Sequence, residues 1–239
     1  MDLKDKVAVV TGSSAGIGSA TALELSQAGA RVVITGRRKE LLDSVAAGLP
    51  SPSAVLAADI ADPQTPERLL ALAKEAFGRC DILVNNAATM AAGPIDSVDL
   101  DQISQMIRVN LDALIRSSYV FGRHFKAQGS GVIINVSSIG AYLISRRAAA
   151  YGAVKHAVEA FSQSLRIELA GSGVKVCTIA PGTTETEVYE RLRANVKSGE
   201  SSAVMLKPKD IAVGIRFMLE QPDRANVVRM AIFPSTEAN

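Results

Sequence analysis

The sequence predicts a single α/β domain in which a parallel sheet carries helices on both faces. Short apolar segments rich in β-branched residues alternate along the chain with segments of helical periodicity, as in successive β–α–β units. The 239 residues are 48% hydrophobic and only 21% charged, so the chain can bury a large core and is not expected to be disordered. No repeat or linker divides it, and residues 1–239 are therefore treated as one domain.

The composition argues against several classes of partner. Aromatic residues make up 4% of the chain and tryptophan is missing, which argues against a surface that stacks nucleic-acid bases. A formal net charge of +2 is too small to indicate a polyanionic partner. No apolar run approaches the ~20 residues of a membrane helix, and residues 1–6 lack the apolar core of a signal peptide. We therefore expect a cytoplasmic protein with neither a nucleic acid nor a membrane as partner.

The cysteines and histidines give no indication of a metal site. Cys80 and Cys177 lie at or inside apolar runs, with no His or Cys nearby at metal-ligand spacing. They are interpreted as buried free thiols in a reducing compartment. His124 and His156 are interpreted as structural or surface residues, and no metal is expected.

A glycine-rich loop follows the first predicted strand, residues 7–10. The loop leads into a helical pattern that ends near Gly29. In the order strand, glycine loop, helix, the glycines allow the backbone to approach a pyrophosphate, which the helix N-terminus attracts. A plain glycine-rich turn is the alternative. The candidate cofactor contacts in this loop are Gly12, Ser13, Ser14, Gly16, Ile17 and Gly18.

The second predicted strand, residues 31–35, ends in a basic turn. In dinucleotide-binding folds a carboxylate near this point holds the ribose 2′-hydroxyl of NAD, whereas an arginine accommodates the 2′-phosphate of NADP. Here Gly36 offers no carboxylate, and Arg37 and Arg38 follow it. A guanidinium binds phosphate through charge and paired hydrogen bonds. The sequence therefore favours NADP(H), mainly through Arg37, with a solvated basic turn as the alternative.

Two further strand ends supply candidate cofactor contacts. The strand at residues 54–58 ends at a carboxylate that could reach an adenine at the sheet edge, and the strand at 81–84 ends in asparagines and small residues. Small residues after a strand allow close approach to a cofactor. One of the two asparagines, Asn85 or Asn86, is expected to tie loops together. The candidate contacts are Asp59, Ile60, Asn86 and Ala87.

Residues 100–125 are predicted to form one long helix with Asn110 in its middle. A buried asparagine in a helix costs stability unless its hydrogen bonds are satisfied. From the residues alone, a functional asparagine and a satisfied structural one are equally possible. Further strands are predicted at 174–179 and 227–233, with a helix beginning at Pro208. The polar stretch 187–207 between them is a candidate lid.

Ser138, Tyr151 and Lys155 form the candidate chemical centre. Tyr151 and Lys155 are four residues apart, so on a helix both side chains leave the same face. A phenol has a pKa of about 10, and a nearby ammonium is expected to lower it toward the range useful for acid–base catalysis. Ser138 follows the predicted strand 132–136, which would place its hydroxyl at the carboxyl edge of the sheet. Many surface helices carry Tyr and Lys at this spacing without any chemical role.

Together these motifs make the chain resemble a short-chain dehydrogenase/reductase of the one-domain type. The resemblance covers essentially all 239 residues. It rests on motifs that occur in the family's order: the glycine loop, Asp59, residues 85–87, Asn110, Ser138, Tyr151 with Lys155, and Pro181 with Gly182. It implies a seven-stranded, doubly wound Rossmann fold and reversible hydride transfer between a nicotinamide and a carbonyl or alcohol. It further implies that Tyr151 donates or accepts the proton, that Lys155 lowers its pKa and binds the nicotinamide ribose, that Ser138 holds the substrate oxygen, and that Asn110 holds a water in a proton relay.

The resemblance extends to the loop after strand 174–179 and to assembly. Pro181, Gly182, Thr184 and Thr186 match the stretch that contacts the nicotinamide amide and the phosphates. In the family the two long helices, residues 100–125 and 149–169, pair across a two-fold axis, which implies a homotetramer or a homodimer. The chain departs from the family at Ala88, where glycine is usual, and at Ala15, where some NADP enzymes carry a basic residue.

The substrate is the least determined part of the interpretation. Its pocket is expected to use residues 90–94, 139–147 and 183–192, with Arg146 and Arg147 either meeting a substrate carboxylate or facing solvent. The stretch after Pro181 and the C-terminal residues look similar to a bacterial branch acting on 3-hydroxy acids and small aldehydes or ketones. A 3-oxoacyl-carrier-protein reductase is the alternative. An NADPH-binding regulatory protein with little turnover is an alternative of another class.

Overall fold

The computed structural model describes residues 1–190 and 204–236, and these form one layered α/β unit. A seven-stranded sheet has the order β3-β2-β1-β4-β5-β6-β7, and every neighbouring pair is parallel. The predicted doubly wound parallel sheet is therefore confirmed. The strands are β1 (Val7–Thr11), β2 (Arg31–Gly36), β3 (Ser53–Ala57), β4 (Ile82–Asn85), β5 (Gly131–Val136), β6 (Val174–Pro181) and β7 (Arg229–Ile232).

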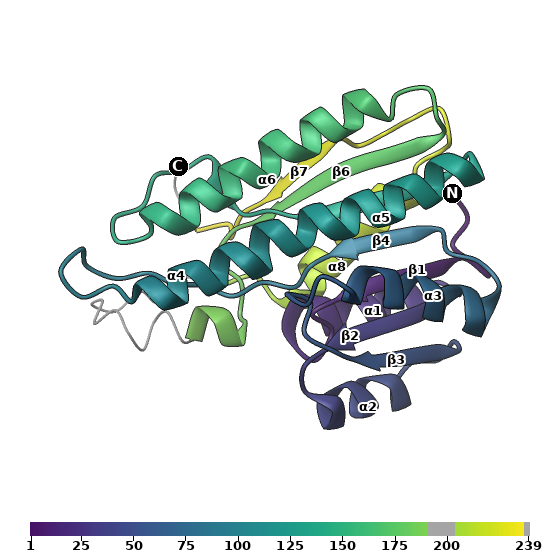
Figure 1. The fold of residues 1–239 in the computed structure, drawn as a ribbon, viewed down its shortest axis with the longest axis horizontal. Coiled ribbons are helices and arrows are strands. Elements are labelled where there is room, and N and C mark those ends of the chain that lie inside the picture. Colours follow the sequence, from purple (N-terminus) through teal and green to yellow (C-terminus); the bar gives the residue numbers. More distant parts are fainter. Residues whose placement is uncertain (191–203, 237–239) are drawn as a thin grey trace.

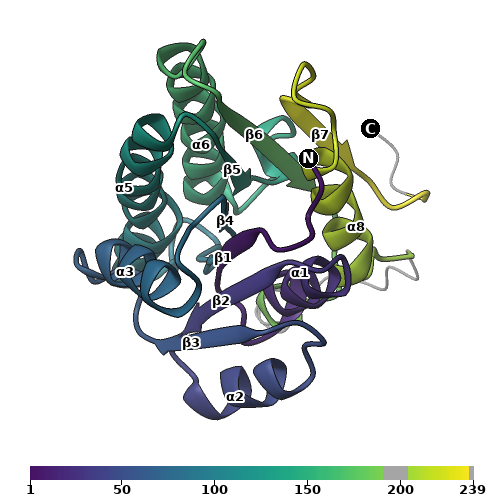
Figure 2. The ribbon, with the colours of Figure 1, turned by 90° about the vertical axis from the view of Figure 1, so that its right-hand side faces the viewer.

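Helices cover both faces of the sheet (Figure 1 and Figure 2). Figure 2 shows α1 and α8 on one face and α3, α5 and α6 on the other, while α2 packs beside β2 and β3. The helices are α1 (Gly16–Gln27), α2 (Lys39–Ala47), α3 (Thr65–Phe77), α4 (Leu100–Ile107), α5 (Ala113–Gln128), α6 (Ala149–Glu168) and α8 (Pro208–Leu219). None of the helices in the described part of the chain has the length and apolar character needed to cross a membrane.

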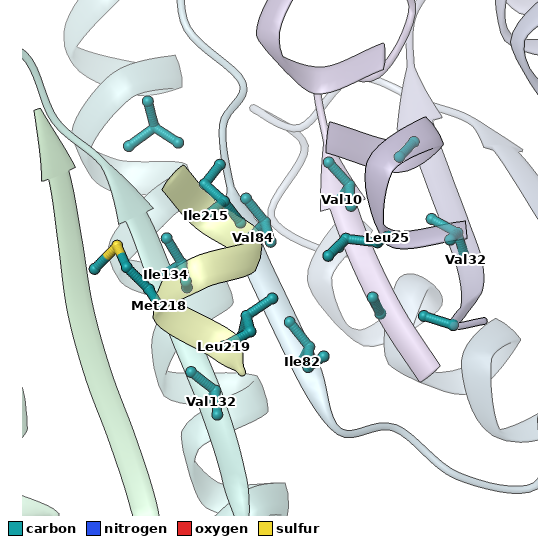
Figure 3. Close-up of a cluster of buried hydrophobic side chains, with 14 of the residues drawn as sticks. Val10, Leu25, Val32, Ile82, Val84, Val132, Ile134, Ile215, Met218 and Leu219 are labelled. Carbon is teal, nitrogen blue, oxygen red and sulfur yellow. The ribbon is translucent and has the colours of Figure 1, made fainter. Parts of the chain in front are cut away.

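The core consists of two apolar layers, one on each face of the sheet. Successive side chains of a strand point to opposite faces, so Val7 and Val9 enter the layer under α3 and α5 while Ala8 and Val10 enter the layer under α1 and α8. Figure 3 shows the second layer, where α8 places Ile215 against the central strands. Because helices cover both faces, the central strands are apolar at nearly every position. This is why they were recognisable as uninterrupted apolar runs.

Buried polar side chains tie β4 to β5 and to the helices behind them. Asn85 Nδ2 donates to Asn135 Oδ1 at 2.8 Å and to Ser118 Oγ at 3.0 Å. Asn135 Nδ2 in turn donates to Ser162 Oγ of α6 at 2.8 Å. Asn85 thus links β4 to β5 and α5, which agrees with the expectation that one of the pair at 85–86 has a structural role.

The predicted single helix over residues 100–125 is corrected by the structure. A π-helical turn, Arg108–Asp112, separates α4 from α5, although Figure 1 shows the two as one continuous rod beside α6. The strand boundaries differ from expectation by one or two residues, because caps and last hydrogen bonds are not encoded in apolar runs. Most of the candidate lid at 187–207 lies outside the described residues.

Candidate active site

The residues singled out from the sequence gather at one edge of the sheet. The glycine loop follows β1, the basic turn follows β2, Asn86 follows β4, and Ser138 follows β5. The 181–186 stretch begins at the end of β6. Since all the strands are parallel, their carboxyl ends meet at this edge, which is where open α/β sheets bind ligands.

The glycine loop packs directly against the loop after β4. Gly12 has a φ of +69°, and a Cβ there would lie 2.7 Å from Ala87 Cα. A Cβ on Gly18 would lie 2.2 Å from the Gly12 carbonyl oxygen. Asn86 Nδ2 donates to Thr11 O at 2.8 Å and to Gly12 O at 3.2 Å. Both glycines are therefore required for the close contact that shapes this loop.

The N-terminus of α1 is free to bind an anion. Its N-cap is Ala15, which provides no capping side chain, and no acidic residue lies in the first turn. The first N–H groups of a helix lack partners within the helix and carry the positive end of its dipole. Gly16, with a φ of +59°, and Ile17 begin this turn. These features fit the phosphates of a dinucleotide cofactor.

Ser13 and Ser14 differ in role. The Ser13 hydroxyl donates to Val10 O at 2.7 Å and its N–H to Thr35 O at 2.9 Å, so Ser13 holds the loop to the sheet. Ser14 Oγ instead accepts a hydrogen bond from Arg38 at 3.1 Å. Ser13 thus has no donor left for a ligand, whereas Ser14 lies at the basic turn.

Arg38 is the guanidinium that lies over the glycine loop. Besides Ser14, it contacts Glu187 in an ion pair with Nη1 2.9 Å from Oε2. Arg37, expected to be the main phosphate ligand, is exposed, and its side chain makes no hydrogen bond or ion pair within the described residues. Gly36 leaves this end of β2 without a carboxylate. The site therefore has a cationic turn of the kind that fits a 2′-phosphate.

Asp59 and Ile60 form the next part of the edge. Asp59 Oδ1 accepts from Ala61 N at 2.9 Å, and its carbonyl accepts from Thr65 Oγ1 at 2.8 Å, which anchors the start of α3. Ile60 packs on the apolar layer under α3 and α5. The geometry thus gives Asp59 a structural role and leaves its second carboxylate oxygen open.

Ser138, Tyr151 and Lys155 come together at the carboxyl end of β5. Ser138 caps a short 3₁₀ turn, Ile139–Ala141, and its Oγ accepts from Gly140 N at 3.1 Å. Lys155 Nζ donates to Val136 O at 2.9 Å and lies 5.8 Å from the centroid of the Tyr151 ring. A Cβ on Gly140 would lie 3.2 Å from Tyr151 Cε1, so this glycine leaves room for the phenol.

The pKa of Tyr151 departs from the sequence-based expectation. Burial raises the pKa of this phenol, and the hydrogen bond with Ser138 only partly offsets the increase. The expected net lowering of the Tyr151 pKa is wrong for this structure, because burial is the largest influence and it acts in the opposite direction. Burial lowers the pKa of Lys155 itself to about 8, against the opposing influence of the Glu159 carboxylate. Tyr151 is consequently a protonated phenol near neutral pH.

Asn110 explains the π-helical turn. It is buried, its Oδ1 accepts from Thr89 N at 2.8 Å, and its Nδ2 donates to Thr89 O at 2.8 Å. Both ends of the amide are therefore occupied by the loop after β4. Of the two readings left open by the sequence, the geometry matches a satisfied asparagine that positions this loop, while its implied contact with a relay water stays a prediction. Single π turns of this kind are frequent at functional sites.

The loop after β6 borders the same edge of the sheet and meets the glycine loop. Pro181 ends β6, and Gly182 N donates to Ile232 O at 2.7 Å. The buried Thr184 donates to Gly182 O at 2.9 Å. Thr186 Cγ2 would lie 3.4 Å from a Cβ on Gly16, so this loop meets the glycine loop.

Sequence reasoning missed three residues that shape the site. Thr11 Oγ1 accepts from the N–H groups of Asn86 and Ala87, each at 3.0 Å. Gly140 accommodates the Tyr151 ring, and Glu187 holds Arg38. The position of Thr11 directly before Gly12 was a usable signal, whereas nothing in the sequence connects Glu187 to Arg38.

Of the residues expected to form the substrate pocket, 191 and 192 lie outside the described residues. Gly93 N donates to Arg147 O at 2.9 Å, which joins the loop after β4 to the loop before α6. Arg146 and Arg147 are both exposed, and Arg147 has a φ of +67°. In the described part of the chain no three His, Cys, Asp or Glu side chains are grouped so as to hold a metal ion.

A parallel sheet with an uncapped helix N-terminus and a Ser–Tyr–Lys group at its carboxyl edge is typical of dinucleotide-binding α/β folds, and comparisons with known proteins give the family. A model of the short chain dehydrogenase family matches residues 6–197. An uncharacterized oxidoreductase of Staphylococcus aureus (strain USA300) is 35% identical over 233 residues, which cover 97% of this chain and 98% of the relative. One from Staphylococcus epidermidis (strain ATCC 35984) is 36% identical over 232 residues, with the same coverage.

Solved structures show the same similarity. The 3-ketoacyl-(acyl-carrier-protein) reductase from Brucella melitensis, complexed with NADH, has a TM-score of 0.86 at 28% identity, covering 98% of each chain. A metagenomic short-chain oxidoreductase in complex with NADP has a TM-score of 0.83 at 30% identity, covering 98% of this chain and 100% of that one. The protein belongs to the short-chain dehydrogenase family and is an oxidoreductase of that family.

Proposed function

We propose that this oxidoreductase uses NADP(H) and reversibly transfers a hydride between the nicotinamide and a carbonyl or alcohol, acting on small ketones, aldehydes or 3-hydroxy acids. The proposal rests on one observation: Ser138, Tyr151 and Lys155 meet at the carboxyl edge of the sheet, which is also the edge at which the uncapped N-terminus of α1 lies. The glycine loop, Arg38, Asn86 and Thr186 border the same edge.

The chain's own residues perform the protein's share of this reaction. The nicotinamide cofactor supplies or accepts the hydride when bound. Ser138 donates a hydrogen bond to the substrate oxygen, and Tyr151 passes its proton to that oxygen as negative charge develops there. The buried Lys155 ammonium stabilises the phenolate that Tyr151 leaves behind and holds the ribose. The raised pKa of Tyr151 suits the proton donor of carbonyl reduction near neutral pH.

The preference for NADP(H) follows from the turn after β2. Gly36 presents no carboxylate that would repel a 2′-phosphate, and Arg37 and Arg38 add positive charge. The comparisons include one structure with NADH and one with NADP, so the cofactor must be identified by measurement on this protein. A 3-oxoacyl-carrier-protein reductase is the second candidate function, because the Brucella melitensis enzyme has a closely similar fold.

Assembly into a homotetramer or homodimer is part of the proposal. Apolar side chains remain exposed along α4, α5 and α6: Leu100 is 71% exposed, Ile107 42%, Tyr119 41% and Ile167 67%. Large exposed apolar surfaces on one side of a protein are typical of subunit contacts.

The test is a panel of small ketones, aldehydes and a 3-oxoacyl thioester, with NADPH oxidation followed by absorbance. We expect turnover with small carbonyls, and a clear preference for the thioester would instead favour the reductase alternative. Tyr151→Phe keeps the ring but removes the proton, so it should lose most turnover while binding NADPH nearly normally. NADPH binding without turnover on any carbonyl would favour a regulatory protein, and full activity in folded Tyr151→Phe would refute the mechanism.

A further inference from the structure

Glu159 is a buried carboxylate one helical turn beyond Lys155. On α6, Tyr151, Lys155 and Glu159 follow one another at intervals of four residues, so their side chains share one face. Glu159 is only 7% exposed. A carboxylate is rarely buried unless it is paired, because burying an unpaired charge is costly. The buried Glu159 lies one helical turn from the buried Lys155, so we asked which groups compensate its charge.

The contacts of Glu159 come from β6 and β7, the last two strands of the sheet. Its Oε2 accepts from Thr178 Oγ1 of β6 at 3.0 Å and lies 3.3 Å from Arg229 Nε at the start of β7. Its Oε1 makes no hydrogen bond within the described residues. Only part of the carboxylate charge is therefore compensated by Arg229, whose own side chain is half exposed.

Glu159 also reaches the loop that carries Ser138. Tyr142 ends the 3₁₀ turn that Ser138 begins, and the guanidinium of Arg229 lies over its ring with 5.2 Å between Cζ and the centroid. Burial, followed by the neighbouring Glu159 carboxylate, raises the pKa of Tyr142. Helix α6, the Ser138–Tyr142 turn, β6 and β7 thus converge on this single carboxylate.

A cavity of about 190 Å³ adjoins the cluster. The residues that line it include Gln163 and Arg166 in addition to Glu159, Thr178 and Arg229. A cavity of this size has room for several water molecules, and the polar side chains that line it offer hydrogen-bond partners. Glu159 therefore borders this cavity and lies one turn of α6 from the buried Lys155.

We propose that Glu159 is a positioning residue of the active site. Its carboxylate stabilises the Lys155 ammonium from the next turn of α6 and anchors the turn that carries Ser138. The inference rests on the proposed function, in which a charged Lys155 supports proton transfer by Tyr151. Glu159 acts through Lys155 and Tyr142 and touches neither substrate nor cofactor.

The charges around Glu159 determine the sign of its effect. The groups that face it are Lys155 and Arg166 from its own helix, Tyr142 from the 3₁₀ turn and Arg229 from β7. Burial lowers the pKa of Lys155 to about 8 and the Glu159 carboxylate opposes this. Removing the carboxylate charge should lower the pKa of Lys155 further, whereas removing the Arg229 charge should leave it unchanged or raise it.

The first test compares pH profiles of kcat/KM for carbonyl reduction. In Glu159→Gln we expect the alkaline limb to move to lower pH by about one unit, the order of effect of one nearby opposite charge. Glu159→Asp keeps the charge and should retain the wild-type limb. Arg229→Gln should not shift the limb downward. Glu168→Gln, an exposed carboxylate on the same helix, is the matched control and should behave as wild type.

Two results would overturn the proposal. One is an unmoved alkaline limb in a folded Glu159→Gln protein. The other is the same downward shift in Arg229→Gln or Glu159→Asp, since this would mean that any break in the ion pair acts by loosening β7. Circular dichroism and thermal melting verify that each variant is folded.

A second readout separates this proposal from the proposed function. NMR titration of ¹³Cε-labelled lysine, with Lys155→Met used to assign the resonance, measures the lysine without any turnover. A lower titration midpoint in Glu159→Gln supports the proposal even if no carbonyl is reduced, in which case the proposed function alone fails. An unchanged midpoint overturns the proposal even if the wild type is active.

Discussion

Lys155 is buried, and the proposed reaction requires its side chain to be charged. Its pKa falls from 10.5 to about 8 on folding because burial disfavours the ammonium. Between these two values the folded chain binds fewer protons than the unfolded chain, so stability rises with pH across this window. Below pH 8 the full free-energy cost of burying the Lys155 ammonium is present. The pKa shift corresponds to about 3 kcal/mol of lost stability.

We therefore expect Lys155→Met to be more stable than the wild type at pH 7 and inactive. The apolar side chain removes the cost of the buried charge but loses the hydrogen bond to Val136 O, which leaves a net gain of about 2 kcal/mol. Urea unfolding at pH 7 and pH 10 measures the difference, which should shrink at the higher pH. A variant less stable than the wild type at pH 7 would contradict this account.

We expect the two arginines after β2 to contribute differently to NADPH binding. Arg38 contacts Ser14 and Glu187, whereas Arg37 contacts neither. A hydrogen bond to a charged group contributes about 1.5–3 kcal/mol, so Arg38→Ala should raise the KM for NADPH by roughly tenfold to a hundredfold and leave NADH nearly unchanged. Arg37→Ala should have a smaller effect, although the sequence alone favoured Arg37.

Glu187→Gln provides the matched control for Arg38. Because this change releases Arg38 from its ion pair, it should lower the KM for NADPH. Gly36→Asp should shift the choice toward NADH, since a carboxylate there repels the 2′-phosphate. Steady-state kinetics with both cofactors checks all of these variants. Equal losses with NADPH and NADH in Arg38→Ala would show that Arg38 does not contact the phosphate.

At the scale of elements, the π-helical turn is held by two hydrogen bonds between Asn110 and Thr89. Asn110→Ala leaves both Thr89 backbone groups without these partners, so we expect a loss of about 1–3 kcal/mol in unfolding free energy and reduced turnover. Arg123→Ala, an exposed change on α5, should leave both quantities unchanged. Urea unfolding and the carbonyl assay measure the two effects, and an Asn110→Ala protein of wild-type stability would refute the role.

How far the sequence predicted each element depends on where the determining contacts lie. Strands β1 and β5 were predicted nearly to the residue, because both faces of the sheet are covered and their apolar runs are local signals. The π turn was not predicted, because it depends on a contact with a loop 21 residues earlier in the chain. The raised pKa of Tyr151 and the position of Arg38 were missed for the same reason: burial and side-chain direction arise from tertiary packing.

At the scale of the whole molecule, the exposed apolar side chains of α4, α5 and α6 predict self-association. Light scattering at micromolar concentration should give the mass of a tetramer or a dimer. Ile167→Lys, which replaces a side chain that is 67% exposed, should weaken the assembly with little effect on subunit folding. A wild-type protein that stays monomeric at this concentration would contradict the prediction.

The reactivity of the two native cysteines can be used to measure conformational opening of the folded chain. Cys80 and Cys177 are free and buried, and burial raises the pKa of each thiol to about 12. Thiol reagents attack the thiolate, so labelling near neutral pH requires transient opening. Cys80 lies two residues before β4, the central strand of the sheet, whereas Cys177 lies in β6 beside the edge strand β7. Faster labelling of Cys177 would reveal fraying of the β6–β7 edge, and equal rates would reveal opening of the whole sheet, with no engineered label in either case.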